Sequence, residues 1–148
     1  GDEAYEYGDI KTAVSFWEKG VKNGEVESEF MLGFLYLRGD DITPNSKKAA
    51  SLLARTFNHE DETFLITIAI SYYKNMRGSR KEKLAIKQFE EAINKEGKIA
   101  QYNLGMLFVT GSGIKKDLKK GAALIKKAKK ANLVRAKKAW KKYGLSKY

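Results

Sequence analysis

The sequence predicts an all-α fold: a right-handed α–α superhelix (solenoid) of helix pairs that ends in a capping helix. The first observation is that apolar or small residues return every 36 residues. The second is that apolar residues recur within each repeat at the i, i+3, i+4 spacing of a helix. Such a period is typical of stacked helical repeats. The four repeating columns are Trp17, Leu53, Phe89 and Ile125; Ala13, Ala49, Ala85 and Gly121; Leu32, Ile68, Leu104 and Trp140; and Tyr36, Tyr72 and Phe108.

The 36-residue period divides this 148-residue chain into the parts of a single repeat domain. A shortened unit over 1–24 comes first. Three full units follow, each expected to form a helix, a loop and a second helix. The chain then ends in a capping helix with a short tail. The full units span 25–60, 61–96 and 97–132, and the cap spans 133–148.

The breaks inside the full units carry Gly or Pro, which are typical of helix ends and turns. They span 38–45, 75–79 and 110–114. Asn45 and Asp117 occupy the same position in the repeat, where a short polar side chain can accept hydrogen bonds from the first amides of the second helix. Lys81 holds that position in the middle unit, so we expect Ser79 to cap its helix instead.

Gly33 and Gly105 recur inside the first helix of their units, with Ala69 at the same position between them. A glycine inside a helix costs ~1 kcal/mol relative to alanine. The recurrence therefore predicts that a neighbouring helix crosses closely at these glycines.

The stretch from Ala100 to Asp117, AQYNLGMLFVTGSGIKKD, closely resembles the Sel-one-like repeat (SLR), a relative of the tetratricopeptide repeat. The second unit keeps much of this pattern, including Gly33 and Gly39. The third departs most, with Phe64 for a small residue, Ala69 for Gly and Asn75 for the loop Gly. In the first unit, Gly8-Asp9 resembles an ordinary tetratricopeptide turn. The resemblance covers about residues 4 to 132.

The resemblance implies that the first helices line an inner, concave wall that binds another protein without catalysis. The wall positions it implies are all apolar or aromatic: Phe30, Phe34, Leu37, Ile66, Ile70, Tyr73, Tyr102, Met106 and Val109. Because 30–37 is apolar all round, something should cover both of its sides. Two interpretations stay open. The wall is a groove for an apolar segment or helix of a partner, or tight curvature packs these residues on one another.

The positive charge is concentrated at the end of the chain. Residues 115–148 carry 14 Lys and Arg side chains against one Asp, whereas residues 1–62 carry seven against 13 acidic ones. Lysine-rich surfaces suit nucleic acid, an anionic membrane, an acidic protein or simply water. Because only Arg135 is an arginine, specific nucleic-acid recognition is not favoured; an acidic protein partner and a solvated face are the leading interpretations. The candidate basic patch comprises Lys126, Lys127, Lys130, Lys137, Lys138, Lys141 and Lys142.

The sequence offers little for catalysis, a metal or a cofactor. There is no cysteine, and His59 is the only histidine, at a junction between units. It therefore lacks the second histidine, one helical turn away, of a common zinc motif. Gly111-Ser112-Gly113 is a weak phosphate-loop candidate and a good repeat turn. No stretch approaches ~18 consecutive apolar residues, so no transmembrane segment is expected. We expect no enzyme, cofactor or metal site.

The leading functional expectation is an adaptor or scaffold that holds one protein partner in its concave face. The alternative is an immunity protein that neutralises a toxic secreted bacterial effector, a role the resemblance brings with it. A further alternative is binding of nucleic acid or anionic membrane through the lysine-rich end. The opening residues resemble exported bacterial family members after removal of a signal peptide, so a periplasmic location is preferred over a cytoplasmic one.

Overall fold

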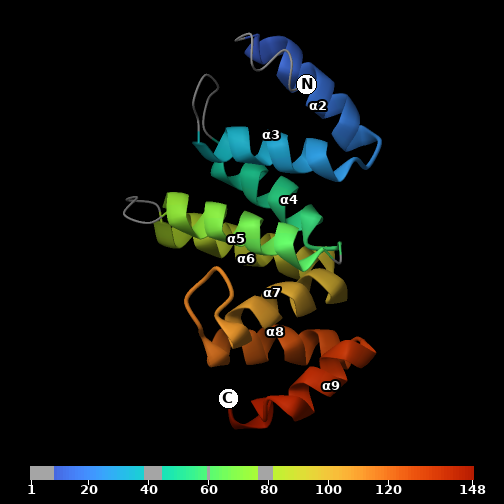
Figure 1. Cartoon of the computed structure of the whole chain (residues 1–148), viewed down its shortest axis with the longest axis vertical. Helices are drawn as coiled ribbons and strands as arrows, with labels where there is room; N and C mark the ends of the chain where they lie inside the picture. The colour runs from blue at the N-terminus through green and yellow to red at the C-terminus, as the bar shows by residue number, and fades with distance from the viewer. Residues whose placement is uncertain (1–8, 39–44, 60, 77–81) are drawn as a thin grey trace.

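A computed structural model describes residues 9–38, 45–59, 61–76 and 82–148. Its helices stack along one axis, with α2 at one end and α9 at the other (Figure 1). These described residues contain no strand, and the prediction of an all-α solenoid is confirmed. The helices are α2 (Ile10–Lys22), α3 (Val26–Arg38), α4 (Ser46–Thr56), α5 (Glu62–Met76), α6 (Glu82–Glu96), α7 (Lys98–Thr110), α8 (Leu118–Lys130) and α9 (Val134–Lys142), followed by a 3-10 turn, η1 (Leu145–Lys147).

Short polar side chains cap the starts of α4 and α8. Asn45 accepts a hydrogen bond from the Lys48 amide at 3.0 Å, and Asp117 accepts one from the Lys120 amide at 3.0 Å. Both predicted caps are therefore confirmed, since each satisfies an amide that lacks a partner within its helix. Ser79, the cap expected for α6, lies outside the described residues.

Glycines let the two helices of the outer pairs approach closely. A Cβ on Gly33 would lie 2.9 Å from the Leu53 side chain, and one on Gly105 would lie 2.8 Å from Ile125. The predicted close crossings are therefore confirmed for α3 against α4 and for α7 against α8. Gly121 completes the second crossing, because its Cβ would come within 2.9 Å of the Gly105 carbonyl oxygen.

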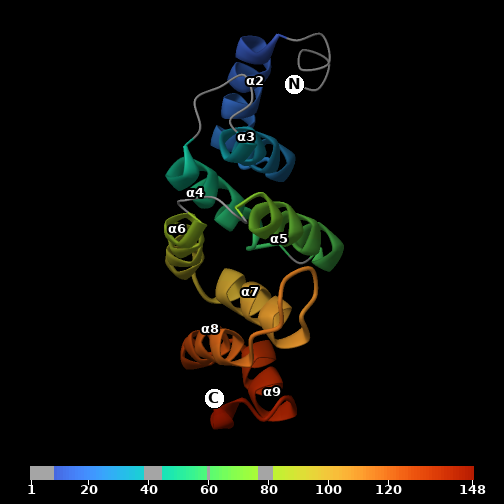
Figure 2. The ribbon, with the colours of Figure 1, turned by 90° about the vertical axis from the view of Figure 1, so that its left-hand side faces the viewer.

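The middle pair packs through aromatic rings instead of through a glycine crossing. The rings of Tyr72 on α5 and Phe89 on α6 stack with their centroids 4.3 Å apart. The Tyr72 hydroxyl also donates a hydrogen bond to the Ala85 carbonyl oxygen at 2.8 Å. Figure 2 shows α5 and α6 on opposite sides of the stack, between α4 and α7. Ala69 does not bring α5 and α6 into close contact, so the rings of Tyr72 and Phe89 fill the space between these two helices.

The repeating columns run through the core. Trp17, Leu53, Phe89 and Ile125 are buried, as are the small residues of the second column. Tyr36 and Trp140 are only half-buried. Trp140 packs on the C-terminal core cluster, which includes Ile125, Ala128 and Ala136. The Lys129 ammonium lies 5.3 Å from the Trp140 ring. The ring therefore covers the core while its outer edge stays in solvent.

An ion pair with a buried carboxylate joins the two helices of the second unit. Glu29 on α3 is almost fully buried and lies 3.2 Å from the Arg55 guanidinium on α4. Burial raises the pKa of the Glu29 carboxyl above its ordinary value of 4.5, and Arg55 opposes this effect only in part. The folded protein thus favours the protonated carboxyl more than the unfolded chain does.

We expect Glu29 to make stability fall as pH rises. A raised carboxyl pKa gives a stabilising contribution that is complete below the ordinary value of 4.5 and is lost as pH rises through the folded-state pKa. Relative to Glu29→Gln, the wild-type chain should therefore lose free energy of unfolding between pH 4.5 and neutrality, measured by urea unfolding. Glu27→Gln, at an exposed position on the same helix, controls for the lost charge. A wild-type chain that gains stability over Glu29→Gln in this pH range would contradict the assignment.

Candidate binding surface

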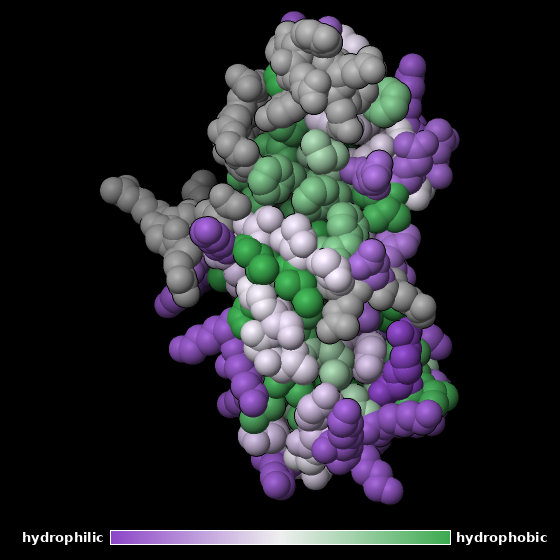
Figure 3. All heavy atoms as spheres, in the orientation of Figure 1, coloured by the Kyte–Doolittle hydropathy of each residue, from purple (hydrophilic) through white to green (hydrophobic). Residues whose placement is uncertain are grey.

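Apolar side chains gather on the face formed by α3 and α5 (Figure 3). We call this set the α3–α5 wall: Phe30, Phe34, Phe64, Ile66 and Ile70. The first four are half-buried, and Ile70 is 42% exposed. The wall therefore presents apolar surface to solvent from two successive units, in the part of the chain where the sequence predicts a partner-binding face.

Ring contacts hold the wall together across the two helices. The Phe30 and Phe34 rings stack at a centroid distance of 5.9 Å, and Phe30 meets Phe64 edge to face at 5.3 Å. The wall residues thus pack on one another, as one of the two open interpretations expects, and the outer side of each still faces solvent. A groove for a partner segment stays a prediction. A fixed arrangement of rings lowers the entropy lost when a partner binds.

Phe64 is the wall residue that sequence reasoning missed. Its counterparts in the neighbouring units, Ser28 and Ala100, are small and buried. The sequence shows Phe64 only as a departure from that pattern. The signal was its size, since a phenyl ring does not fit where a serine is buried and turns toward Phe30 instead.

Leu37 and Val109 are corrections to the predicted concave face, because both are buried. Leu37 belongs to the core cluster that includes Leu53 and Phe89. Val109 is 2% exposed and belongs to the C-terminal core cluster. A Cβ on Gly121 would lie 2.6 Å from the Val109 side chain, so this valine fills the space that the glycine leaves. Neither residue is accessible to a partner.

Tyr102 and Met106 lie apart from the α3–α5 wall. Both are half-buried and pack against the C-terminal core cluster. The Arg135 guanidinium lies 5.2 Å from the Tyr102 ring, a cation–π distance. Tyr102 therefore contacts α9 through Arg135, and the nine predicted positions do not all belong to the α3–α5 wall.

The loop over 111–117 ends the wall on its C-terminal side. Gly113 adopts a positive φ of +77°, and a Cβ there would lie 2.8 Å from Ile70 and 3.0 Å from Ile66. Only glycine allows this backbone to approach α5 so closely. The sequence predicts the turn but not its contact with α5, because that contact joins different units.

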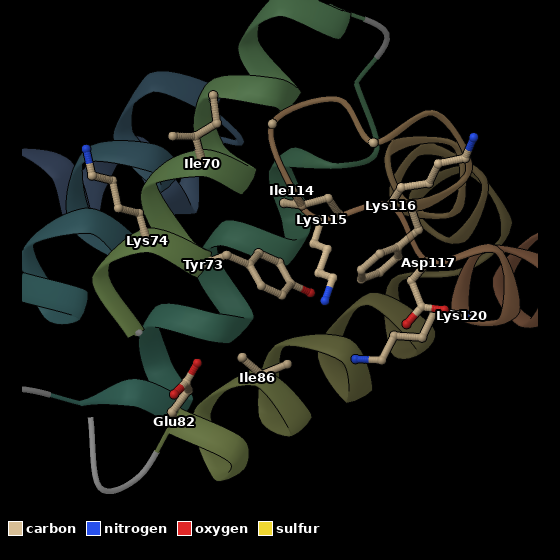
Figure 4. Close-up of a pocket in the computed structure, with 13 residues that line it drawn as sticks. Ile70, Tyr73, Lys74, Glu82, Ile86, Ile114, Lys115, Lys116, Asp117 and Lys120 are labelled. Carbon is tan, nitrogen blue, oxygen red and sulfur yellow. Dashed lines mark hydrogen bonds between the residues drawn. The ribbon is translucent and has the colours of Figure 1, made fainter. Parts of the chain in front are cut away.

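A cavity of about 790 Å³ opens beside the wall, between α5, the start of α6 and the 111–117 loop (Figure 4). Tyr73, a predicted wall residue, lines it. The Tyr73 ring contacts Phe89 and Phe108 at centroid distances of 6.0 and 6.1 Å, and its hydroxyl donates to the Glu90 carboxylate at 3.4 Å. Burial raises the pKa of Tyr73, so its hydroxyl keeps its proton at neutral pH. We call this space the α5–α6 cavity.

The seven lysines of the predicted basic patch are all exposed on α8 and α9. Lys127 donates to Asn94 at 3.1 Å, and Lys137 donates to Asn132 at 3.3 Å. Among the described residues, none of the seven forms an ion pair with a carboxylate. Their charge is therefore available to solvent or to an acidic partner.

The described residues hold no group of His, Cys, Asp and Glu that could bind a metal ion. His59 is half-buried at the junction after α4, and its carbonyl oxygen accepts a hydrogen bond from the Asn103 side chain at 3.0 Å. In the same part of the chain, no helix has the length and apolar character needed to cross a bilayer.

The model of the Sel1 repeat family matches residues 26–57 and 98–133. Both segments are therefore Sel1 repeats. The two matches coincide with the α3–α4 and α7–α8 pairs, which are the pairs with glycine crossings. Repeats of this kind generally act as non-catalytic interaction modules. The middle pair, which has Ala69 and the aromatic stack, lies outside both matches.

Among solved structures, this chain is similar to a protective antigen present in uropathogenic Escherichia coli strains, which displays an SLR fold. The two sequences are 29% identical, and the TM-score is 0.37. The match covers 83% of this chain and 26% of that chain, so this chain spans about a quarter of that protein's length. No curated protein matches the sequence.

Proposed function

We propose that this chain is a non-catalytic adaptor that holds an apolar segment of a partner protein on the α3–α5 wall. The observation that carries the proposal is the set of half-buried rings on this face, together with Ile70, which is 42% exposed. Contiguous exposed apolar patches on soluble proteins usually mark interaction sites. Rings on successive helices are also suited to receive the apolar face of a partner helix.

Removing two wall side chains should weaken partner binding while the chain stays folded. For Phe34→Ser with Ile70→Ser, we expect affinity to fall by at least about tenfold, because each lost apolar contact contributes on the order of 1 kcal/mol or more. The partner is captured from native cells with the tagged wild-type chain and identified by mass spectrometry. Its affinity for both chains is then measured by calorimetry.

A matched control keeps the test specific to the wall. Phe16 on α2 and Leu84 on α6 are 54% and 52% exposed, so Phe16→Ser with Leu84→Ser removes the same kinds of side chain elsewhere. This control should bind as the wild type does, and thermal melting should show both variants folded. Unchanged binding by a folded wall variant would refute the proposal.

The exposed lysines of α8 and α9 support a second contact, with an acidic region of the same partner. Such charges chiefly increase the rate of association, and salt weakens their effect.

The identity of the captured partner also distinguishes between the remaining functional hypotheses. A toxic hydrolase would indicate a periplasmic immunity protein, whereas envelope or secretion-machinery subunits would indicate a scaffold. Binding to duplex DNA or anionic vesicles with a steep salt dependence would favour the lysine-rich end as the main site.

A further inference from the structure

We propose that the α5–α6 cavity receives an acidic segment of the partner protein. An apolar side chain of that segment enters the cavity, and a neighbouring carboxylate pairs with Lys115. This inference rests on the proposed function, since it specifies the chemistry of the partner beside the α3–α5 wall.

The cavity follows from how the middle helix pair is built. The stacked rings of Tyr72 and Phe89 fill the contact between α5 and α6, where the other pairs have a glycine crossing. The 111–117 loop then closes the far side by resting on Ile66 and Ile70 through Gly113. The resulting volume of about 790 Å³ lies within the usual range of ligand pockets, roughly 300–1,000 Å³.

Part of the cavity lining is apolar and adjoins the wall. Ile70, Ile86 and Phe108 line the cavity, and Ile70 is also a member of the α3–α5 wall. A segment that lies on the wall can therefore place a bulky side chain into the cavity next to Ile70. Burying such a side chain contributes about 1.5–3 kcal/mol.

The polar groups of the cavity leave an excess of positive charge. Glu90 beside it accepts from the Tyr73 hydroxyl at 3.4 Å and pairs with Lys120 at 3.0 Å. Asp117 is occupied as the cap of α8. The lining contains four lysines against two carboxylates: Lys74, Lys115, Lys116 and Lys120 against Glu82 and Asp117.

Lys115 is the lysine placed to meet a ligand. Figure 4 shows the side chains of Lys115 and Tyr73 directed toward the middle of the cavity, whereas those of Lys74 and Lys116 extend away from it. No carboxylate among the described residues forms an ion pair with Lys115. An ammonium group beside an apolar lining selects a ligand that combines a carboxylate with an apolar side chain. A nucleic-acid backbone, which binds through several phosphates in succession, fits this single ammonium poorly.

The test uses the full chain and a display library of short random peptides. We expect the selected peptides to carry Asp or Glu next to Trp, Phe or Leu. Fluorescence polarisation then measures their affinity for two cavity variants: Lys115→Glu, which reverses the charge, and Ile86→Trp, which fills the space. Each should weaken binding by about tenfold or more, and added salt should weaken binding to the wild type.

The matched control is Lys22→Glu, which makes the same charge change at an exposed position on α2, outside both the cavity and the lysines of α8 and α9. It should change affinity by no more than about twofold, because solvent and salt screen distant charges. Thermal melting confirms that each variant is folded. Selection of no peptide, selection of peptides without carboxylates, or unchanged binding by both cavity variants would overturn the proposal. Peptides that lose affinity with Phe34→Ser but with neither cavity variant would refute the cavity and leave the wall as the binding site.

Discussion

Phe89→Ala should lower the free energy of unfolding by about 3–5 kcal/mol, the usual cost of deleting a buried phenyl ring. Phe89 is fully buried and contacts rings from two units: Tyr72 at 4.3 Å and Phe57 at 5.6 Å. Removing the Phe89 ring leaves a cavity between α5 and α6 and weakens the packing of these helices against α4. Urea unfolding followed by circular dichroism measures the loss.

Leu84→Ala is the control for this substitution, since Leu84 lies on the same helix and is 52% exposed. It should change stability by no more than about 0.5 kcal/mol. If Phe89→Ala were as mild as Leu84→Ala, the aromatic stack would not be what holds the middle pair.

Gly121→Val should destabilise the chain by about 2–3 kcal/mol through overpacking. The added Cβ would lie 2.6 Å from the Val109 side chain and 2.9 Å from the Gly105 carbonyl oxygen. A side chain can move aside, but the backbone oxygen of a packed helix cannot move without separating α7 from α8. The free energy of unfolding in urea reports the effect.

Ala123→Val adds the same branched side chain at an exposed position of α8. It should cost less than about 1 kcal/mol, which is the range of helix propensities. Equal losses for the two valine variants would mean that the α7–α8 crossing is looser than its geometry indicates.

The fold could be predicted from the sequence because its determinants repeat. A column such as Leu32, Ile68 and Leu104 recurs at a fixed interval, and all three residues are buried. The caps and glycine crossings depend on local geometry within one unit, so residue type and position were enough. Ser79 and most of the first two loops lie outside the described residues, where those expectations remain predictions.

The binding surface was less predictable because it depends on departures from the repeat. Val109 shares its repeat position with Tyr73, but it is buried because Gly121 leaves space for it, whereas Tyr73 lines a cavity. Phe64 occupies the position of Ser28 and Ala100, yet it joins the wall. These outcomes follow from contacts between units, such as that of Gly113 with Ile70, and no spacing within one unit encodes them.

Site-specific photo-crosslinking in native cells tests the central claim most directly. A benzophenone analogue of phenylalanine replaces Phe34 on the α3–α5 wall or, as the matched site, Phe16 on α2, which is 54% exposed. If the wall holds the partner, irradiation should give one discrete adduct from position 34 and none from position 16. An adduct from position 16 with none from position 34 would contradict the account.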